Sequence, residues 1–456
     1  MYNLLIASLG FLTSYFCIAK PNAPSLFCAD PLGAETTLCQ EKSVSCDLCH
    51  TEGSSLNLFG ATVKKNLHKQ ATESTEVFST ETFEKSMAAI MDDDSDADGT
   101  SNREELTAGS SPSINNADQN KKSKLVYDTE LAFRRVYNIY CGISPQYKKL
   151  QELRESPKPE QKKLLHAALS NCLDSDYWKK IALHRLADNR IRPLSTTGYG
   201  GQVVLADYRY DYRLFSYILT GDRDSRDLLT AKYHIDPEGN RVEGKIPRQE
   251  APQVGKRIVI GGGQPLEPER RYGMLTTQWY LTNFTMFAKL PRNAASQAYR
   301  SYLGLDLAKG EGLMEIPGEP RDVDNRNVKQ KECALCHSTL DAAAYSFSTY
   351  IGIETVTAFL FNANGQYSAS RSNWEADGYI LGKKVKDLEA WVKVALESDY
   401  FKKNLATMFF EQALDRKPLE HEKAEFTKLW QKLPEDNYNA SKLIHRLADT
   451  LAFGGR

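Results

Sequence analysis

Residues 131–140 read Leu-Ala-Phe-Arg-Arg-Val-Tyr-Asn-Ile-Tyr, and residues 164–173 read Leu-Leu-His-Ala-Ala-Leu-Ser-Asn-Cys-Leu. In each stretch apolar side chains recur three or four positions apart, which is the spacing that places them on one face of an α-helix. Gly142 and Pro145 lie between the stretches and predict two separate helices. The same pattern returns after Arg271 and in four stretches between 385 and 453. The sequence therefore predicts a mainly α fold.

A short β-hairpin is expected within residues 358–381. There Phe359-Leu360-Phe361 precedes the turn dipeptide Asn364-Gly365, and a second turn is expected at Asp377-Gly378. No internal repeat of fixed period is present in the sequence.

The length of 456 residues is about three times that of a typical domain, so two or three domains are expected. Changes in composition divide the chain into six segments. These are a signal peptide at 1–19, a loop segment at 20–45 that a disulfide could staple, a small module at 46–113, a polar linker at 114–124, a helical domain at 125–330 and a carboxy-terminal domain at 331–456.

The amino-terminal segment is apolar from Leu4 to Ile18 and is followed by Ala19-Lys20, a pattern typical of a signal peptide. Alternatives are a retained membrane anchor and lipid attachment at Cys17, although bulky residues precede that cysteine. No later segment approaches the ~18 consecutive apolar residues of a membrane span. We therefore expect a periplasmic or secreted protein without a transmembrane anchor after signal cleavage.

Basic and acidic side chains nearly balance, since 58 Lys and Arg face 59 Asp and Glu and leave a formal net charge of −1. Nucleic-acid-binding proteins are generally recognised by an excess of clustered positive charge. We therefore expect no nucleic-acid partner.

Two five-residue motifs, Cys46-Asp-Leu-Cys49-His50 and Cys333-Ala-Leu-Cys336-His337, match the pattern of c-type haem attachment. Two thiols one helical turn apart can bond the two vinyl groups of the porphyrin, and the adjacent imidazole can then bind the iron. A zinc site would need further Cys or His nearby at matching spacing, and a dithiol oxidoreductase needs no histidine in two copies. The motifs predict two haem c groups, with His50 and His337 as axial ligands.

The second axial ligand of each iron remains open at this stage. For the first haem the candidates include Met87 and Met91, whose four-residue spacing fits a core stripe of a helix equally well. For the second haem Met408 is the favoured candidate among several methionines and histidines. An iron without a sixth ligand would be a reaction centre rather than an electron relay.

A calcium loop is expected at residues 94–105, which fit Asp-x-Asp-x-Asp-Gly-x5-Glu without a mismatch. Such a loop wraps a divalent cation with carboxylates at positions 1, 3 and 5, a backbone carbonyl at position 7 and a bidentate Glu at position 12. Gly and Pro soon after the loop favour a structural calcium clip over a sensor. The expected ligand positions are Asp94, Asp96, Asp98, Thr100, Asn102 and Glu105.

The amino-terminal module, residues 46–112, resembles small extracellular cytochrome-type modules and temptin-like domains. The resemblance is carried by the haem motif, Asn57-Leu-Phe-Gly60, the calcium loop running into Glu105-Leu106, and Gly109-Ser-Ser-Pro112. The resemblance implies a calcium-binding extracellular module. Because temptin-like members need not carry haem, it leaves haem at the first motif open.

The remainder resembles the planctomycete-type cytochrome proteins, secreted chains with a carboxy-terminal haem motif. Departures are Ala342-Ala343-Ala344, where Pro-Leu-Gly is usual, and Asp415, where Gly is more frequent. The resemblance implies a helical haem protein and names no substrate. Its landmarks, in the family order, are 222–233, Arg271-Tyr-Gly-Met-Leu-Thr276, Cys333–His337 with Asp341, Asn364-Gly-Gln-Tyr367 and Phe409–Arg416.

Nine cysteines are present, and four of them belong to the haem motifs while Cys17 leaves with the signal peptide. The remaining four, Cys28, Cys39, Cys141 and Cys172, allow three pairings. Proximity in the sequence and the helix pair around positions 141 and 172 favour Cys28–Cys39 and Cys141–Cys172. Such disulfides fit an oxidising compartment.

The leading hypothesis is a calcium-stabilised dihaem c-type cytochrome that exchanges electrons with a redox partner protein or a small-molecule donor or acceptor. One alternative is a peroxidase-like or oxygenase-like haem enzyme with one open iron, so enzymatic activity stays undecided. Another is a calcium-dependent binding protein with a single haem or with none. Haem counting and carbon monoxide binding distinguish these hypotheses.

Overall fold

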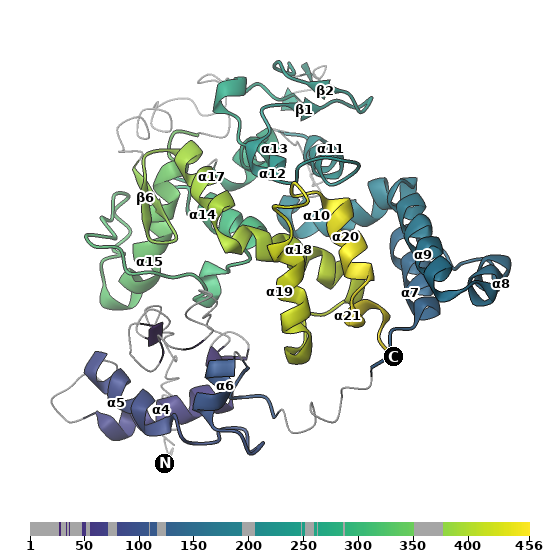
Figure 1. The fold of residues 1–456 in the computed structure, drawn as a ribbon. Helices are drawn as coiled ribbons and strands as arrows, with labels where there is room; N and C mark the ends of the chain where they lie inside the picture. Colours follow the sequence, from purple (N-terminus) through teal and green to yellow (C-terminus); the bar gives the residue numbers. More distant parts are fainter. Residues whose placement is uncertain are drawn as a thin grey trace, which may run out of the picture. The chain divides into compact units, whose positions relative to one another are not determined.

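The computed structural model describes residues 27–28, 33, 36, 48–51, 55–71, 80–108, 110–115, 125–193, 206–247, 249–250, 260–261, 263–285, 288–350 and 377–456. The chain forms two compact units, Met1–Ser113 and Ile114–Arg456 (Figure 1). The first unit therefore ends at the residue where the sequence places the end of the small module.

Three helices build the described part of the first unit: α4 (Leu58–Gln70), α5 (Thr80–Ile90) and α6 (Asn102–Ala108). Asn57 caps α4 by accepting a hydrogen bond from the Gly60 backbone N–H. Helices α4 and α5 pack on each other through apolar side chains spaced by three or four residues. The core contains Phe27, Phe59, Val63, Leu67, Phe83, Met87, Ile90, Met91 and Leu106.

The second unit begins with the helices predicted from residues 131–140 and 164–173. Helix α7 (Thr129–Val136) continues into the π-helical turn η2 (Tyr137–Cys141), which ends at Gly142 with φ +68°. Gly142 suits this left-handed position because it lacks a Cβ atom. The following elements are α8 (Tyr147–Glu155), α9 (Lys158–Leu173), the π-helical turn η3 (Trp178–Ala182) and α10 (Leu183–Ile191).

The middle of the second unit combines short helices with two small antiparallel pairs of strands. Strand β1 (His234–Ile235) pairs with β2 (Arg241–Val242), and β3 (Gln249–Glu250) pairs with β4 (Ile260–Gly261). The helical elements are α11 (Arg209–Ile218), α12 (Asp227–Thr230), η4 (Pro268–Arg270), η5 (Gly273–Thr276), α13 (Gln278–Phe284), α14 (Arg292–Ala298), η6 (Tyr299–Leu303) and η7 (Leu307–Lys309).

The carboxy-terminal part starts with α15 (Lys331–Ala344), which carries the second cysteine motif. The last helix expected from the sequence is divided near Asp449 into two helices, Ala440–Ala448 and Leu451–Gly454. The other elements are η8 (Tyr345–Phe347), the antiparallel strands β5 (Gly378–Ile380) and β6 (Lys383–Val385), α17 (Leu388–Glu397), α18 (Asp399–Leu414), η9 (Glu420–Glu422), α19 (Lys423–Gln431), α20 (Ala440–Ala448) and α21 (Leu451–Gly454).

A hairpin overlaps the end of the stretch in which the sequence predicts one and continues beyond it. Most of the expected hairpin, including Asn364-Gly365, lies outside the described residues, and the described hairpin turns at Leu381-Gly382. Gly378 is a strand residue rather than part of a turn. It packs so closely on α15 that an added Cβ would lie 2.8 Å from the Ala342 carbonyl oxygen, so the glycine serves close packing.

The boundary expected at residue 330 is corrected by the structure, because residues 114–456 form one compact unit. Helices α14 and α15, which lie on either side of that position, pack directly on each other. One continuous core joins early residues such as Trp178 to late residues such as Phe409, whose rings contact each other. The fold is mainly α, as predicted.

No helix in the described ranges is long and apolar enough to cross a membrane. Cys141 on η2 and Cys172 on α9 form a disulfide, the pairing favoured by the sequence. Cys28 is also disulfide-bonded, and its partner lies outside the described residues, as does Cys39.

Candidate functional site

Helix α15 presents the second cysteine motif within its first two turns. Cys333 and Cys336 are one turn apart and are free thiols, the first partly exposed and the second exposed. The His337 side chain is 25% exposed. Two reachable thiols and an adjacent imidazole on one helix fit the donor set of a covalent haem.

His337 is held by a carboxylate on the same helix. Its Nδ1 atom lies 2.8 Å from Oδ1 of Asp341, one turn later, and the Asp341 side chain is fully buried. Among the described residues, Nε2 of His337 makes no hydrogen bond. Nε2 is therefore the ring nitrogen left for a ligand.

Arg292, at the start of α14, binds two carboxylates at once. Its Nε and Nη2 atoms donate to Asp341 at 2.5 and 2.7 Å, and its Nη1 and Nη2 atoms donate to Asp324 at 2.6 and 2.9 Å. The hydrogen bond from Arg292 is the main reason that the pKa of Asp324 is lowered. Burial opposes the charge of Arg292, but the two carboxylates outweigh it and raise the arginine's pKa.

The side of α15 that bears Ser338 and Thr339 is fixed by an extended segment. The Met314 backbone N–H donates to Oγ1 of Thr339, and that hydroxyl donates to the Met314 carbonyl, both at 2.6 Å. Ile316 donates to Oγ of Ser338 at 2.7 Å. These hydrogen bonds fix α15 at the two residues that directly follow His337.

In the first unit, the end of the first motif is locked against α4. The Asn57 backbone N–H donates to the Cys49 carbonyl at 3.0 Å, and its side-chain amide donates to the Leu48 carbonyl at 3.0 Å. A Cβ added at Gly60 would lie only 1.9 Å from the Cys49 carbonyl oxygen. The Asn57-Leu-Phe-Gly60 motif therefore holds residues 48–49 in direct contact with the start of α4.

His50 carries a buried Nδ1 atom that has no hydrogen-bond partner among the described residues. A buried polar atom without a partner costs free energy, and a ligand or water at that nitrogen would remove the cost. Cys46 lies outside the described residues, so the fit of a haem to the first motif depends on Cys49 and His50. The described residues therefore leave the His50 imidazole available as a donor to a ligand.

The candidate sixth ligands occupy two different cores. Met87 and Met91 are buried in the same core that Leu48 and Cys49 contact, so they lie in the neighbourhood of the first motif. Met408 is buried on α18, which packs chiefly on α17, α19 and η6 rather than on α15.

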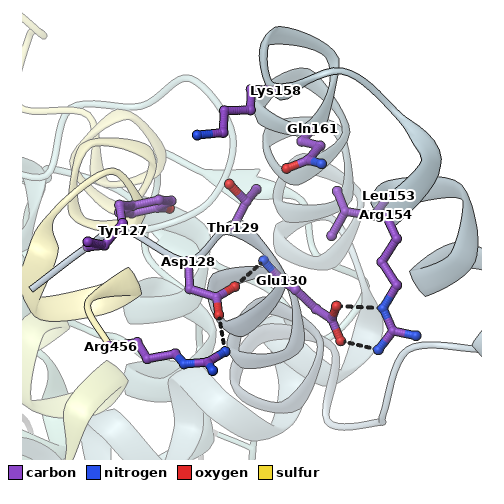
Figure 2. A pocket seen from close by; sticks show the side chains of 10 residues that line it. Tyr127, Asp128, Thr129, Glu130, Leu153, Arg154, Lys158, Gln161 and Arg456 are labelled. Atoms are coloured by element: carbon purple, nitrogen blue, oxygen red, sulfur yellow. Dashed lines mark hydrogen bonds and ion pairs between the residues drawn. The ribbon is translucent and has the colours of Figure 1, made fainter.

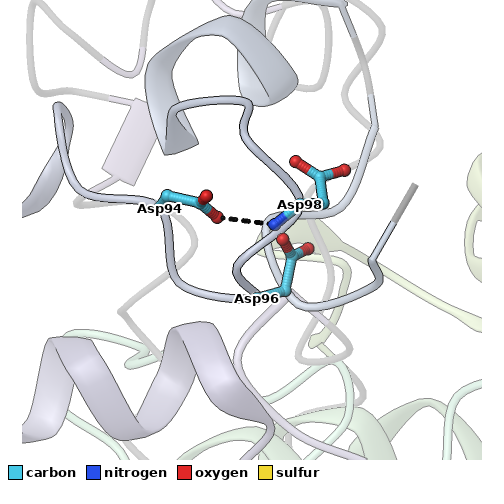
Figure 3. Close-up of side chains that lie close together, drawn as sticks. All are labelled: Asp94, Asp96 and Asp98. Carbon is cyan, nitrogen blue, oxygen red and sulfur yellow. Dashed lines mark hydrogen bonds between the residues drawn. The ribbon is translucent and has the colours of Figure 1, made fainter. Parts of the chain in front are cut away.

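The expected calcium loop brings three carboxylates together (Figure 3). Asp94, Asp96 and Asp98 each offer an oxygen, and these atoms lie within 4.8 Å of one another. Asp94 accepts hydrogen bonds from the backbone N–H groups of Asp98 and Gly99, at 3.2 and 2.8 Å. Gly99 has φ +92°, so the turn needs a glycine there.

The charges of this loop repel one another. Burial, together with the nearby charges of Asp98 and Asp94, raises the pKa of Asp96, whereas the Gly99 backbone N–H lowers the pKa of Asp94. The Asn102 side chain closes the loop, because it accepts from Ser95 N–H and donates to the Ile90 carbonyl at 3.2 and 2.6 Å. Thr100 lies in the loop, and Glu105 is buried on α6.

A surface pocket of about 480 Å³ lies at the start of α7 (Figure 2). Within it Arg154 is paired with Glu130, and Arg456 with Asp128. These two ion pairs neutralise Arg154 and Arg456, and Lys158 also lies in the lining. The lining, which includes neither cysteine motif, consists of Val126, Tyr127, Asp128, Thr129, Glu130, Leu153, Arg154, Lys158, Gln161 and Arg456.

Comparisons with protein-family models, with curated proteins and with solved structures found no match to this chain. The site therefore rests on its own geometry.

Sequence reasoning missed Arg292 and Asp324. Both lie far from the motif in the sequence, and neither belongs to a local pattern. Asp341 did have a local signal, since a carboxylate four residues after His337 on a helix lies on the same face.

Proposed function

We propose that this protein is a c-type cytochrome that binds two haem groups covalently and transfers electrons. The observation that carries the proposal is α15, where two reachable free thiols adjoin an imidazole whose Nδ1 is held by buried Asp341. In this proposal Cys333 and Cys336 form the two thioether bonds, and His337 binds the iron through Nε2. The haem supplies one-electron redox chemistry when bound.

The other haem, at the first motif, would be held by Cys46, Cys49 and His50. Support comes from the contacts that fix the Cys49 carbonyl against the start of α4. Unlike His337, His50 has no acceptor on its Nδ1 atom among the described residues. Met87 and Met91 are the candidate sixth ligands for this haem, because they are buried in the core that Cys49 contacts. Met408, which the sequence predicted for the haem on α15, lies on a helix that packs chiefly on α17, α19 and η6, so these contacts do not support it as a ligand there.

The loop at residues 94–105 would bind one calcium ion through Asp94, Asp96, Asp98, the Thr100 carbonyl, Glu105 and, directly or through water, Asn102. Three converging carboxylates support this assignment, since a cation would relieve their mutual repulsion. The ion would act as a clip between α5 and α6.

A periplasmic or secreted location is part of the proposal. The Cys141–Cys172 disulfide supports it, because disulfides persist mainly in oxidising compartments. The electron-exchange partner would be a protein or a small molecule, and the balanced net charge of −1 gives no reason to expect nucleic acid.

Haem counting by the pyridine haemochrome assay tests the proposal. The purified chain should contain two covalently bound haems. The double variant Cys333→Ser/Cys336→Ser should retain only the haem at Cys46 and Cys49. The double variant Cys46→Ser/Cys49→Ser should retain only the haem on α15. The double variant Cys141→Ser/Cys172→Ser is the matched control and should keep both. A wild-type chain that matures in an assembly-competent host without haem would refute the proposal.

A haem redox enzyme is the second candidate, and the contact between His337 and Asp341 favours it. A carboxylate on Nδ1 makes the imidazole a stronger ligand, which is a common way of tuning a metal centre for chemistry. Carbon monoxide binding to the reduced protein tests this candidate. No spectral shift would indicate that both irons have six ligands and would remove it.

A further inference from the structure

Electron transfer by a haem on α15 requires Cys333, Cys336 and His337, yet the structure adds a buried charged network behind the histidine. Asp341 is fully buried, and the side chains of Asp324 and Arg292 are 2% and 16% exposed. Removing three charged groups from water costs free energy that their pairing offsets only in part, so the network adds little to stability by itself. These three residues form what we call the proximal network.

The proximal network fixes which nitrogen of His337 carries the proton. Oδ1 of Asp341 already accepts a hydrogen bond from Nε of Arg292, and an ionised carboxylate can only accept. Nδ1 of His337, 2.8 Å away, must therefore donate to it. In the neutral imidazole, Nε2 then keeps its lone pair, directed away from Asp341, for a metal.

The proximal network also carries a negative charge. Two carboxylates face one guanidinium, which leaves a net charge of about −1 among buried atoms. Arg326 approaches Asp324 at 3.9 Å, but its side chain is 70% exposed and solvent weakens its effect.

We propose that Asp341, held in place by Arg292 and Asp324, is a positioning residue that sets the tautomer of His337 and lowers the reduction potential of the iron bound at α15. This inference rests on the proposed haem at Cys333–His337. Two effects act in the same direction: the anionic acceptor makes the imidazole a stronger donor, and the buried negative charge favours the oxidised iron.

Spectroelectrochemical titration of the haem-loaded protein tests this inference with the variant Asp341→Asn. Asn keeps the shape and a carbonyl acceptor but loses the charge. At a fixed ambient potential, the ratio of reduced to oxidised haem at α15 should rise about tenfold or more. For one electron, each factor of ten in this ratio corresponds to a rise of about 59 mV in the reduction potential. The control Asp174→Asn removes an exposed carboxylate and should leave the ratio unchanged.

A second variant covers the case in which Asp341→Asn does not fold. Asp324→Asn leaves the contact between His337 and Asp341 in place but removes one buried charge, so it should raise the ratio in the same direction. Unchanged potentials in folded, haem-loaded variants would overturn the inference and leave the proposed function intact. A wild-type α15 without haem would overturn both.

Discussion

Gly60 shows how a single residue couples a helix to a neighbouring loop. Its missing side chain lets the Cys49 carbonyl lie against α4, where any Cβ atom would be 1.9 Å away. Backbone atoms cannot move aside as easily as a flexible side chain, so the close approach requires glycine at this position. The glycine therefore determines where the end of the first motif lies.

The variant Gly60→Ala should destabilise the first unit by roughly 2 kcal/mol, because overpacking outweighs the better helix propensity of alanine. Thermal unfolding followed by far-UV circular dichroism reports the helices of both units, so a transition that tryptophan fluorescence does not share belongs to the first unit. All five tryptophans lie beyond residue 113, so tryptophan fluorescence reports on the second unit and should not change.

Gly244→Ala serves as the control for this prediction, since a Cβ there would meet no atom within 4 Å. Equal unfolding temperatures for the Gly60 and Gly244 variants would contradict the close-packing argument.

His234 on β1 is an example of a buried side chain that titrates. The residue is 2% exposed, and both ring nitrogens lack a hydrogen-bond partner among the described residues. Burial first, and then the positive charge of Arg271, lower the pKa of His234 to about 3. The unfolded chain therefore binds a proton at this histidine more readily than the folded chain does.

The sign of the pH effect follows from this lowered pKa. The stability associated with neutral His234 is fully present above the ordinary pKa of about 6.5 and is lost as the pH falls toward 3. Between pH 6.5 and 4.5 the free energy of unfolding of the wild type should fall by roughly 2–3 kcal/mol more than that of His234→Phe. Urea unfolding followed by tryptophan fluorescence at the two pH values measures this difference.

His421, whose side chain is 28% exposed, supplies the control, because His421→Phe removes a histidine that is not buried and should lose about as much stability between the two pH values as the wild type. If the His234 and His421 variants respond to pH alike, the buried histidine is not the cause.

At the scale of elements, the disulfide fastens the first helices of the second unit together. Cys141 ends the π-helical turn η2, and Cys172 is buried near the end of α9, so the bond closes a loop with a sequence separation of 31. Phe133 and Leu165 belong to the same core, so packing and the covalent bond hold the same pair of helices.

Removing this disulfide with Cys141→Ala/Cys172→Ala should destabilise the second unit by roughly 3–4 kcal/mol. The reason is that the unfolded chain regains the entropy of an open loop of this length. Tryptophan-monitored urea unfolding gives the value, and the number of bound haems should stay constant. A loss below about 1 kcal/mol would show that packing alone fixes α9 on η2.

Asp415 illustrates how an element can end without glycine. It ends α18 with φ +54°, a left-handed conformation in which glycine is usual and Asp is tolerated.

At the scale of the whole molecule, the two units have separate hydrophobic cores. The expected calcium site lies entirely within the first unit, between α5 and α6. Ligand binding stabilises only the unit that contains the site, and the gain is about 2.7 kcal/mol at a concentration one hundred times the dissociation constant.

Removing calcium with a chelator should therefore lower the unfolding temperature of the first unit, followed by far-UV circular dichroism. The unfolding temperature of the second unit, followed by tryptophan fluorescence, should stay the same. The variant Asp94→Asn should abolish the response to calcium. Asp92→Asn, which removes an exposed carboxylate just outside the loop, should retain it. A tryptophan transition that shifts with calcium would show that the units unfold together.

Much of the candidate site could be predicted from the sequence because its parts are local. The Cys333–His337 motif fits within two helical turns, and the loop at 94–105 brings its carboxylates together through its own turns. Asp341 lies on the face of His337 by helical spacing alone. The amphipathic pattern likewise predicted most helices, since the periodicity of apolar residues reports which face is buried.

The sequence by itself determined the mainly α class, the helical faces and the local motifs. Only the tertiary structure decided that residues 114–456 form one unit and that Arg292 joins Asp341 to Asp324. It also decided that His234 is buried with no hydrogen-bond partner in the part of the chain that is described. The physical reason is that periodicity shows that a face is buried but not what covers it. Arg292 and Asp341 are 49 positions apart, and only the packing of α14 on α15 brings them together.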